Sequence, residues 1–323
     1  MNEWNEQLKN EYESLTQKCG FVDLGHRTQI ELTGDDHLAF LHNLCTNEIK
    51  GLEVGRGCEA YLTSVRGKVI AHILVFRTAE GLIVETAAEW GQTLMEHFDR
   101  YIIMEDVQLQ DHSSDWRELL VSGAEACEGL ARLGVAEVPR EIGDHRPTTI
   151  GEQQVWLRRV PFLGQPTFVI AIRQDQAAAT EEVLRNADFV ACSEESFHRV
   201  RVETGFPWFP QDIGEDNLPQ EVARDQQAIS FTKGCYLGQE TVARLDALGH
   251  VNRILTTIQL EGNRIPGLGA EVHVDGQVVG KLSSVAYSPQ HDSVLGLTIL
   301  RCSALKSSLQ VDGIPAVALV ATE

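Results

Sequence analysis

One cysteine of this chain, Cys235, lies among residues that favour a reactive thiol. The stretch runs Lys-Gly-Cys-Tyr-Leu-Gly-Gln-Glu, from Lys233 to Glu240. A cationic neighbour lowers the pKa of a thiol, and a flanking glycine lets a partner approach the sulfur. A lone cysteine is more often an inert core residue, but this stretch is too polar and glycine-rich for a core strand. We therefore predict that Cys235 is a functional thiol, assisted by Lys233.

The other six cysteines give no comparable signal, and we expect them to be core residues. They are scattered, none forms a C-x-x-C pair, and their odd total with Cys235 argues against a disulfide framework. No spacing suits a zinc site or the four thiolates of an iron–sulfur cluster. We predict no metal site. The six are Cys19, Cys45, Cys58, Cys127, Cys192 and Cys302.

Composition narrows the class of protein and the partners. The 323 residues carry 27 Lys and Arg against 47 Asp and Glu, a formal charge of -20. Such a surface repels a phosphate backbone, so we expect no direct nucleic-acid partner. No apolar run approaches the ~20 residues that span a bilayer, and the N-terminus lacks the features of a secretory signal. We expect a cytoplasmic protein with no membrane partner.

The elements that must position these residues follow from hydrophobic periodicity and turn residues. Strands pair as hairpins instead of alternating with crossover helices, so the fold class is α+β. Residues 144–153 are expected to be a loop, 206–234 a long irregular connection, and everything from 253 onward short strands of an all-β unit. The remaining expected strands are 28–33, three between 59 and 86, 119–123, and two pairing across 162–166. The expected helices are 38–47, 90–101, one through Leu130 and Leu133 that ends at Gly134, 175–186 and 193–205.

The Lys233–Glu240 stretch resembles the signature of the YgfZ-like folate-binding proteins, relatives of the T-protein (aminomethyltransferase) of glycine cleavage. Eight consecutive residues form a specific motif, in which Gly234, Tyr236, Gly238, Gln239 and Glu240 accompany the thiol. The resemblance extends to residues 229–231, 242–244 and 201–205, and to "ELTGDDHLAFLHNLCTNEI" (31–49).

This resemblance implies a three-domain α+β arrangement around a central channel that holds tetrahydrofolate or a one-carbon derivative, with a C-terminal β-barrel. Residues 1–240 would form the folate-binding region, as two intertwined subdomains of roughly 25–115 and 116–240. Residues 250–323 would form the barrel.

Glu203 is the residue that the resemblance assigns to the pterin ring, through the segment Arg-Val-Glu-Thr-Gly. The chemistry suits, because a carboxylate offers two acceptors to the two adjacent N–H donors of a pterin edge. A carboxylate in the last turn of a helix also opposes the helix dipole. The alternative is a surface ion pair with Arg199 at i,i+4 spacing. Further candidates for the cleft are Tyr61, His72, Tyr236 and Arg244, with Trp208 and Phe209 as channel walls.

One departure from the aminomethyltransferase pattern concerns Ala71 and His72. They stand where the T-protein carries an Asp pair, one member of which is catalytic, so the acid that protonates the leaving amine is missing. His72 could act as an acid or base, but a histidine within a strand is more often structural.

The resemblance therefore implies a folate-binding protein that supports assembly or repair of iron–sulfur proteins, including cluster enzymes that modify tRNA. Its partners would be folate and iron–sulfur proteins or their assembly factors. Two alternatives stay open. One is a folate-dependent methyl- or aminomethyltransferase, and the other is a thiol scaffold that acts through Cys235 without folate.

Overall fold

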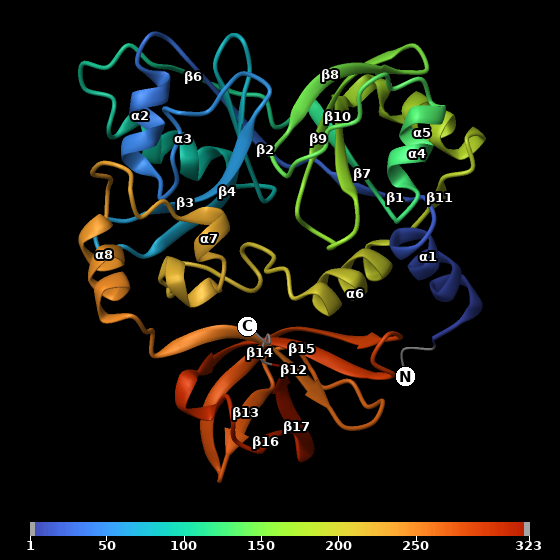
Figure 1. The fold of residues 1–323 in the computed structure, drawn as a ribbon, viewed down its shortest axis with the longest axis vertical. Helices are drawn as coiled ribbons and strands as arrows, with labels where there is room; N and C mark the ends of the chain where they lie inside the picture. The colour runs from blue at the N-terminus through green and yellow to red at the C-terminus, as the bar shows by residue number, and fades with distance from the viewer. Residues whose placement is uncertain (1–3, 320–323) are drawn as a thin grey trace.

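Three β-sheets organise the part of the chain that the computed structural model describes, residues 4–319 (Figure 1). The first has the order β3-β4-β5-β2-β6. Its strands are β2 (Thr28–Thr33), β3 (Gly57–Thr63), β4 (Val69–Arg77), β5 (Leu82–Thr86) and β6 (Gln108–Asp111). β3 and β4 form an antiparallel hairpin in which Tyr61 pairs with His72.

The second sheet has the order β11-β1-β7-β10-β9-β8. It consists of β1 (Gly20–Gly25), β7 (Trp116–Ser122), β8 (His145–Ile150), β9 (Gln153–Arg159), β10 (Thr167–Arg173) and β11 (Val190–Ala191). β1 precedes the first sheet in sequence but belongs to the second, so the chain crosses between the sheets. The domain boundaries themselves stay a prediction.

The third sheet closes into a six-stranded barrel of order β12-β15-β14-β13-β16-β17. Its strands are β12 (Arg253–Leu260), β13 (Glu271–Val274), β14 (Gln277–Ser288), β15 (Ser293–Arg301), β16 (Leu309–Val311) and β17 (Ile314–Leu319). The predicted α+β class and C-terminal β-barrel are confirmed. Figure 1 shows the barrel below the two open sheets, with α6 and α7 in the layer between them.

The α-helices are short and cover the sheets. They are α1 (Glu6–Thr16), α2 (His37–Leu44), α3 (Gly91–Asp99), α4 (Ala126–Arg132), α5 (Ala177–Asn186), α6 (Glu194–Thr204), α7 (Asp225–Ala228) and α8 (Gln239–Leu248), with 3-10 turns η1 (Gln174–Gln176), η2 (Pro219–Val222) and η3 (Cys302–Ala304). α6 ends where the sequence indicates, because Gly205 adopts a left-handed conformation with φ 72. No helix within residues 4–319 is long and apolar enough to cross a membrane.

The predicted loop at 144–153 is wrong, because most of it is strand β8, which pairs with β9. Pro147 obscured the strand in the sequence. β8 lies at the edge of its sheet, where a residue without an N–H is tolerated. Gly151 turns the chain with φ 62.

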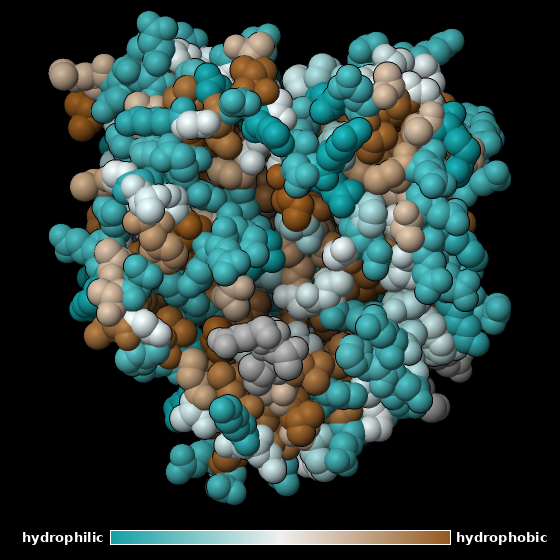
Figure 2. Space-filling model, viewed as in Figure 1, coloured by the Kyte–Doolittle hydropathy of each residue, from teal (hydrophilic) through white to brown (hydrophobic). Residues whose placement is uncertain are grey.

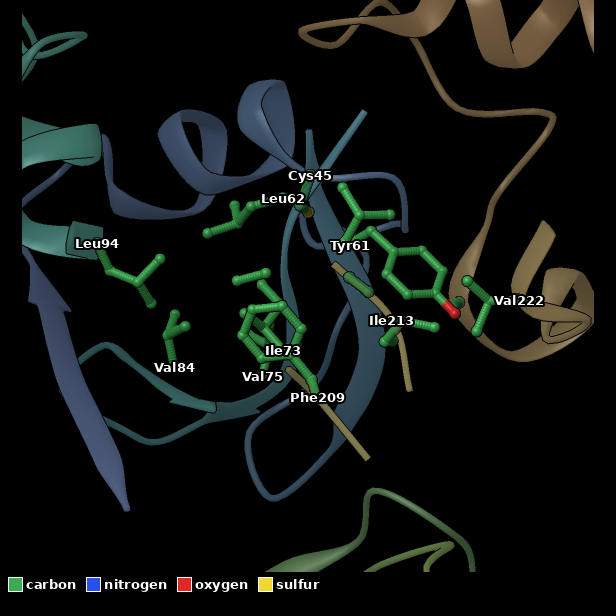
Figure 3. Close-up of a cluster of buried hydrophobic side chains, with 14 of the residues drawn as sticks. Cys45, Tyr61, Leu62, Ile73, Val75, Val84, Leu94, Phe209, Ile213 and Val222 are labelled. Atoms are coloured by element: carbon green, nitrogen blue, oxygen red, sulfur yellow. The ribbon is translucent and has the colours of Figure 1, made fainter. Parts of the chain in front are cut away.

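Residues 206–234, expected to be irregular, include the short helical segments η2 and α7, and part of this connection belongs to the core. Phe209, Ile213 and Val222 are buried in the cluster that also contains Tyr61 and residues of β4. Figure 3 shows these side chains against the inner face of the first sheet. This connection therefore covers one face of the first sheet. It also brings polar residues that are distant in sequence to β3 and β4.

A buried network of charged and polar side chains joins the two open sheets. Arg158 of β9 donates to Glu85 of β5 at 2.9 Å, to Glu118 of β7 at 3.3 Å and to Gln29 of β2 at 3.0 Å. Arg27 donates to Glu85 at 3.1 Å. Burial raises the pKa of Glu118 well above its usual range, and the nearby Glu85 carboxylate adds to the shift.

Candidate functional site

Residues 233–240, called the motif loop below, are attached to the C-terminal end of α2 through Lys233. Its ammonium donates to the carbonyl oxygens of His42, Cys45 and Asn47 at 2.6, 2.8 and 2.7 Å. The last carbonyls of a helix lack intrahelical partners and favour a cation. Lys233 is buried. Although the stretch is polar and glycine-rich, Lys233 is thus a core anchor, and its effect on the Cys235 thiol stays a prediction.

The motif loop also contacts the β3–β4 hairpin through two glycines. A Cβ at Gly238 would lie 2.4 Å from the carbonyl oxygen of Ser64 and 2.9 Å from Cα of Gly67. Both glycines have positive φ, 81 and 72. No other residue fits at either position without moving backbone. By contrast, a Cβ at Gly234 would meet nothing within 4 Å, so that side of the cysteine is open.

Cys235 is exposed, whereas the other six cysteines, all within the described part of the chain, are buried or half-buried. Burial raises the pKa of the thiols of Cys45, Cys58 and Cys192. The buried thiols are thus poorer nucleophiles. Cys235 is therefore the thiol that a solvent-borne partner can reach.

The other motif residues divide between core and surface. Tyr236 is buried, and its ring lies 5.0 Å from the ammonium of Lys233. Gln239 and Glu240 open α8. Arg244 is exposed on α8 and does not contact the side chains described next.

His72 belongs to a buried charged cluster. Its Nε2 lies 2.8 Å from Oε1 of Glu59, and Arg224 donates to both oxygens of the same carboxylate. Burial alone would raise the pKa of Glu59, but His72 and Arg224 outweigh it and hold this pKa at about 2. Ala71, the other replacement, is fully buried. The two positions therefore present no free carboxylate.

Tyr61 stacks beside His72, with ring centroids 5.1 Å apart. Figure 3 shows its hydroxyl pointing toward Val222. This hydroxyl is buried and has no hydrogen-bond partner among residues 4–319. A small cavity of about 20 Å³ borders the cluster, and its walls include Arg27, His72, Phe162, Phe206, Trp208 and Phe209. In the view of Figure 1, the space-filling model of Figure 2 shows hydrophobic residues at the centre of the molecular surface, between the parts that contain the two open sheets.

Glu203 lies where α1, α6 and the barrel meet. Its Oε1 accepts from the hydroxyls of Tyr12 at 3.1 Å and Ser288 at 2.8 Å. Its Oε2 is buried and has no hydrogen-bond partner among the described residues. The alternative of an ion pair with Arg199 is wrong, because Arg199 pairs with Glu195 instead. One carboxylate oxygen of Glu203 is thus held and the other is free to accept.

Glu59 and Arg224 were not among the site residues predicted from the sequence. Glu59 shares a strand face with Tyr61 because side chains alternate along β3, and it lies diagonally across the hairpin from His72. That signal was readable once the hairpin register was known. Arg224, 165 residues from Glu59, had no local signal.

Comparison with known proteins decides the family. A model described as the GCVT N-terminal domain matches residues 1–232. The chain belongs to the GCVT family. This family typically binds tetrahydrofolate.

Relatives of this GCVT-family chain are distant. It is 24% identical over 292 residues to the aminomethyltransferase of Rubrobacter xylanophilus, covering 90% of this chain and 78% of that one. It is 25% identical over 304 residues to the aminomethyltransferase of Symbiobacterium thermophilum, covering 89% and 80%. A protein of Arabidopsis thaliana named as a chloroplastic transferase is 23% identical, and the chain spans 65% of its length.

A solved structure confirms the predicted T-protein fold. The glycine cleavage system aminomethyltransferase T from Bartonella henselae superposes with a TM-score of 0.85 at 17% identity, over 96% of this chain and 87% of that one. Identity this low establishes the fold alone.

Some of the side chains are suited to bind a folate, but the cavity beside His72 is too small for one. The free oxygen of Glu203 is a buried acceptor of the kind that a pterin N–H group satisfies. The cavity beside His72 is about 20 Å³, room for about one water and far too little for a pterin. A pterin could not enter it unless side chains of residues 206–209 moved.

Proposed function

We propose that this GCVT-family chain is a tetrahydrofolate-binding protein of the YgfZ type that supports assembly or repair of iron–sulfur proteins, including cluster enzymes that modify tRNA. The proposal rests on the residues found at positions 71 and 72, neither of which is a carboxylate. Ala71 is core, and His72 is hydrogen-bonded to Glu59. The group that the resemblance makes essential for aminomethyl transfer is therefore absent.

In this proposal Glu203 holds the folate and Cys235 acts on the protein partner. Bound tetrahydrofolate would supply one-carbon or reducing chemistry. Tyr12 and Ser288 orient the Glu203 carboxylate by occupying Oε1, which leaves Oε2 for the ligand. Cys235 presents an exposed sulfur on a loop that Lys233 anchors.

Folate titration of Glu203→Gln tests the binding half of the proposal. The amide keeps the shape of the side chain but loses the charge and one acceptor. Each charge-assisted hydrogen bond contributes about 1.5–3 kcal/mol, so we expect calorimetry to show at least about tenfold weaker binding of tetrahydrofolate. Glu194→Ala, an exposed change on the same helix, is the control. Equal affinity in wild type and Glu203→Gln would exclude Glu203, and a wild type that binds no folate would overturn the proposal.

Aminomethyl transfer is the second candidate, favoured by the relatives and by the position of His72 at the central cavity. We expect no turnover when this chain replaces the T-protein in a reconstituted glycine-cleavage assay. Sustained turnover that disappears in His72→Ala would establish the transferase instead. Rescue by Cys235→Ser of cells that depend on iron–sulfur enzymes would remove the thiol from the proposal.

A further inference from the structure

An open groove lies between α2 and residues 101–105, and Leu237 of the motif loop is among the residues that line it. Figure 1 shows α2 and α8, which follows the motif loop, on the same side of the molecule. Its volume is about 560 Å³, within the range of ligand and peptide pockets. The walls are largely apolar and include Phe40 and Leu44 of α2.

The rim of the groove displays two large apolar side chains. Ile103 is 83% exposed and Met104 is 92% exposed. Glu105 fixes the turn that holds them there, because its Oε2 accepts the backbone N–H groups of Ile103 at 2.8 Å and Met104 at 3.0 Å. Adjacent exposed apolar residues beside a hollow mark an interaction surface. A turn that is already ordered also loses little entropy when a partner binds.

Carboxylates also lie at the groove. Asp36 and Glu105 line it, and Asp106 is held against Asp36 by a backbone N–H bond of 2.9 Å. With Asp35 they make four acids. The carboxylates of Asp36, Glu105 and Asp106 accept backbone N–H groups, and none of the four has a Lys or Arg partner among the ion pairs of residues 4–319. Lysine or arginine on a partner would find complementary charge here. A second copy of this chain, with a charge of -20, or an anionic membrane would be repelled.

The groove lies beside the exposed thiol. The backbone N–H of Leu237 donates to the carbonyl of Asn43 at 2.9 Å, which fixes the motif loop on α2. Cys235 is two residues before Leu237, and two residues span at most about 7 Å. A chain seated in the groove can therefore reach the sulfur of Cys235.

We propose that this groove is the docking site for a polypeptide segment of the protein partner, one that carries adjacent apolar side chains flanked by lysine or arginine, and that it guides the bound segment to Cys235. The statement that the bound protein is the one on which the thiol acts rests on the proposed function. The groove itself does not depend on folate.

Thiol–disulfide exchange with a designed peptide tests the proposal. The probe is a short peptide with an apolar centre and lysines on both sides, made with its only cysteine at one end or the other as the mixed disulfide with thionitrobenzoate. The Cys235 thiolate attacks the peptide sulfur, a protein–peptide disulfide forms, and thionitrobenzoate leaves with the electron pair of the broken bond while the thiol proton goes to solvent. Release of thionitrobenzoate is followed by its absorbance.

We expect at least one form of the lysine peptide to react at least about tenfold faster than a peptide with glutamate in place of lysine, because docking raises the local concentration. The double variant Ile103→Ser, Met104→Ser should abolish that advantage. The control Leu268→Ser, an exposed change on the barrel, should keep it, and Cys235→Ser should not react at this rate. Equal rates for the lysine and glutamate peptides, or an advantage that survives the double variant, would overturn the proposal. Folate titration is a separate measurement, so the docking proposal can be disproved without the folate proposal, and the folate proposal without the docking proposal.

Discussion

At the scale of single residues, Glu59 is the charge on which the His72 cluster depends. Removing one partner of a buried ion pair leaves an uncompensated charge, so Glu59→Gln should lower the free energy of unfolding by about 3 kcal/mol near pH 7. The pKa of Glu59 is lowered from 4.5 to about 2 in the folded protein. Its contribution is therefore present above pH 4.5 and is lost as the pH falls toward 2. Urea unfolding of wild type and variant at several pH values measures it.

Glu48→Gln, a change at a more exposed carboxylate, serves as the control. A difference between wild type and Glu59→Gln that stayed the same from neutral to acidic pH would show that the ionised carboxylate is not what stabilises the cluster.

At the scale of secondary-structure elements, Lys233 joins the motif loop to the end of α2. Lys233→Met keeps the length of the side chain but leaves three buried carbonyl groups without their donor. A buried unsatisfied polar group costs about 1–3 kcal/mol. We expect a lower melting temperature and a loosened loop, and labelling of the buried Cys45 by iodoacetamide reports the loosening.

Lys50→Met, at an exposed lysine near the same helix, should change neither the melting temperature nor the labelling. If Lys233→Met also left both unchanged, Lys233 would not be the anchor of the loop, and a direct effect on the Cys235 thiol would be its remaining role.

At the scale of the whole molecule, the two open sheets meet through the network of Arg158, Glu85 and Glu118. These side chains are at most 3% exposed. In Arg158→Met the buried side chains of Glu85, Glu118 and Gln29 lose the cation that donates to all three, and only Arg27 stays. We therefore expect a loss of about 3–5 kcal/mol in the free energy of unfolding near pH 7. Urea unfolding followed by tryptophan fluorescence measures the loss.

Arg185→Met removes a surface pair with Glu181, and such pairs contribute about 0–1 kcal/mol. Equal stability of the two variants would show that apolar contacts alone hold the sheets together.

The sequence by itself determined most of the elements and the exposure of Cys235 within the motif. Alternating apolar residues and the turn at Gly67 were enough to predict the β3–β4 hairpin, and Gly205 was enough to predict the end of α6. The short strands after residue 253 predicted an all-β unit, and the family resemblance implied that this unit is a barrel. These features are readable because strand alternation, helix periodicity and glycine conformation are local properties. The polar, glycine-rich surroundings of Cys235 likewise predicted its exposure.

Only the tertiary structure decided which side chains meet. Glu203 takes its partners from residues 191 and 85 positions away, and Glu59 is matched by Arg224 across 165 positions. Lys233 proved to be a buried anchor because α2 ends beside the loop, a fact that no local pattern contains. Periodicity tells which face of a strand or helix a side chain occupies, but its partner across the core depends on how the sheets, the connection 206–234 and the barrel pack together.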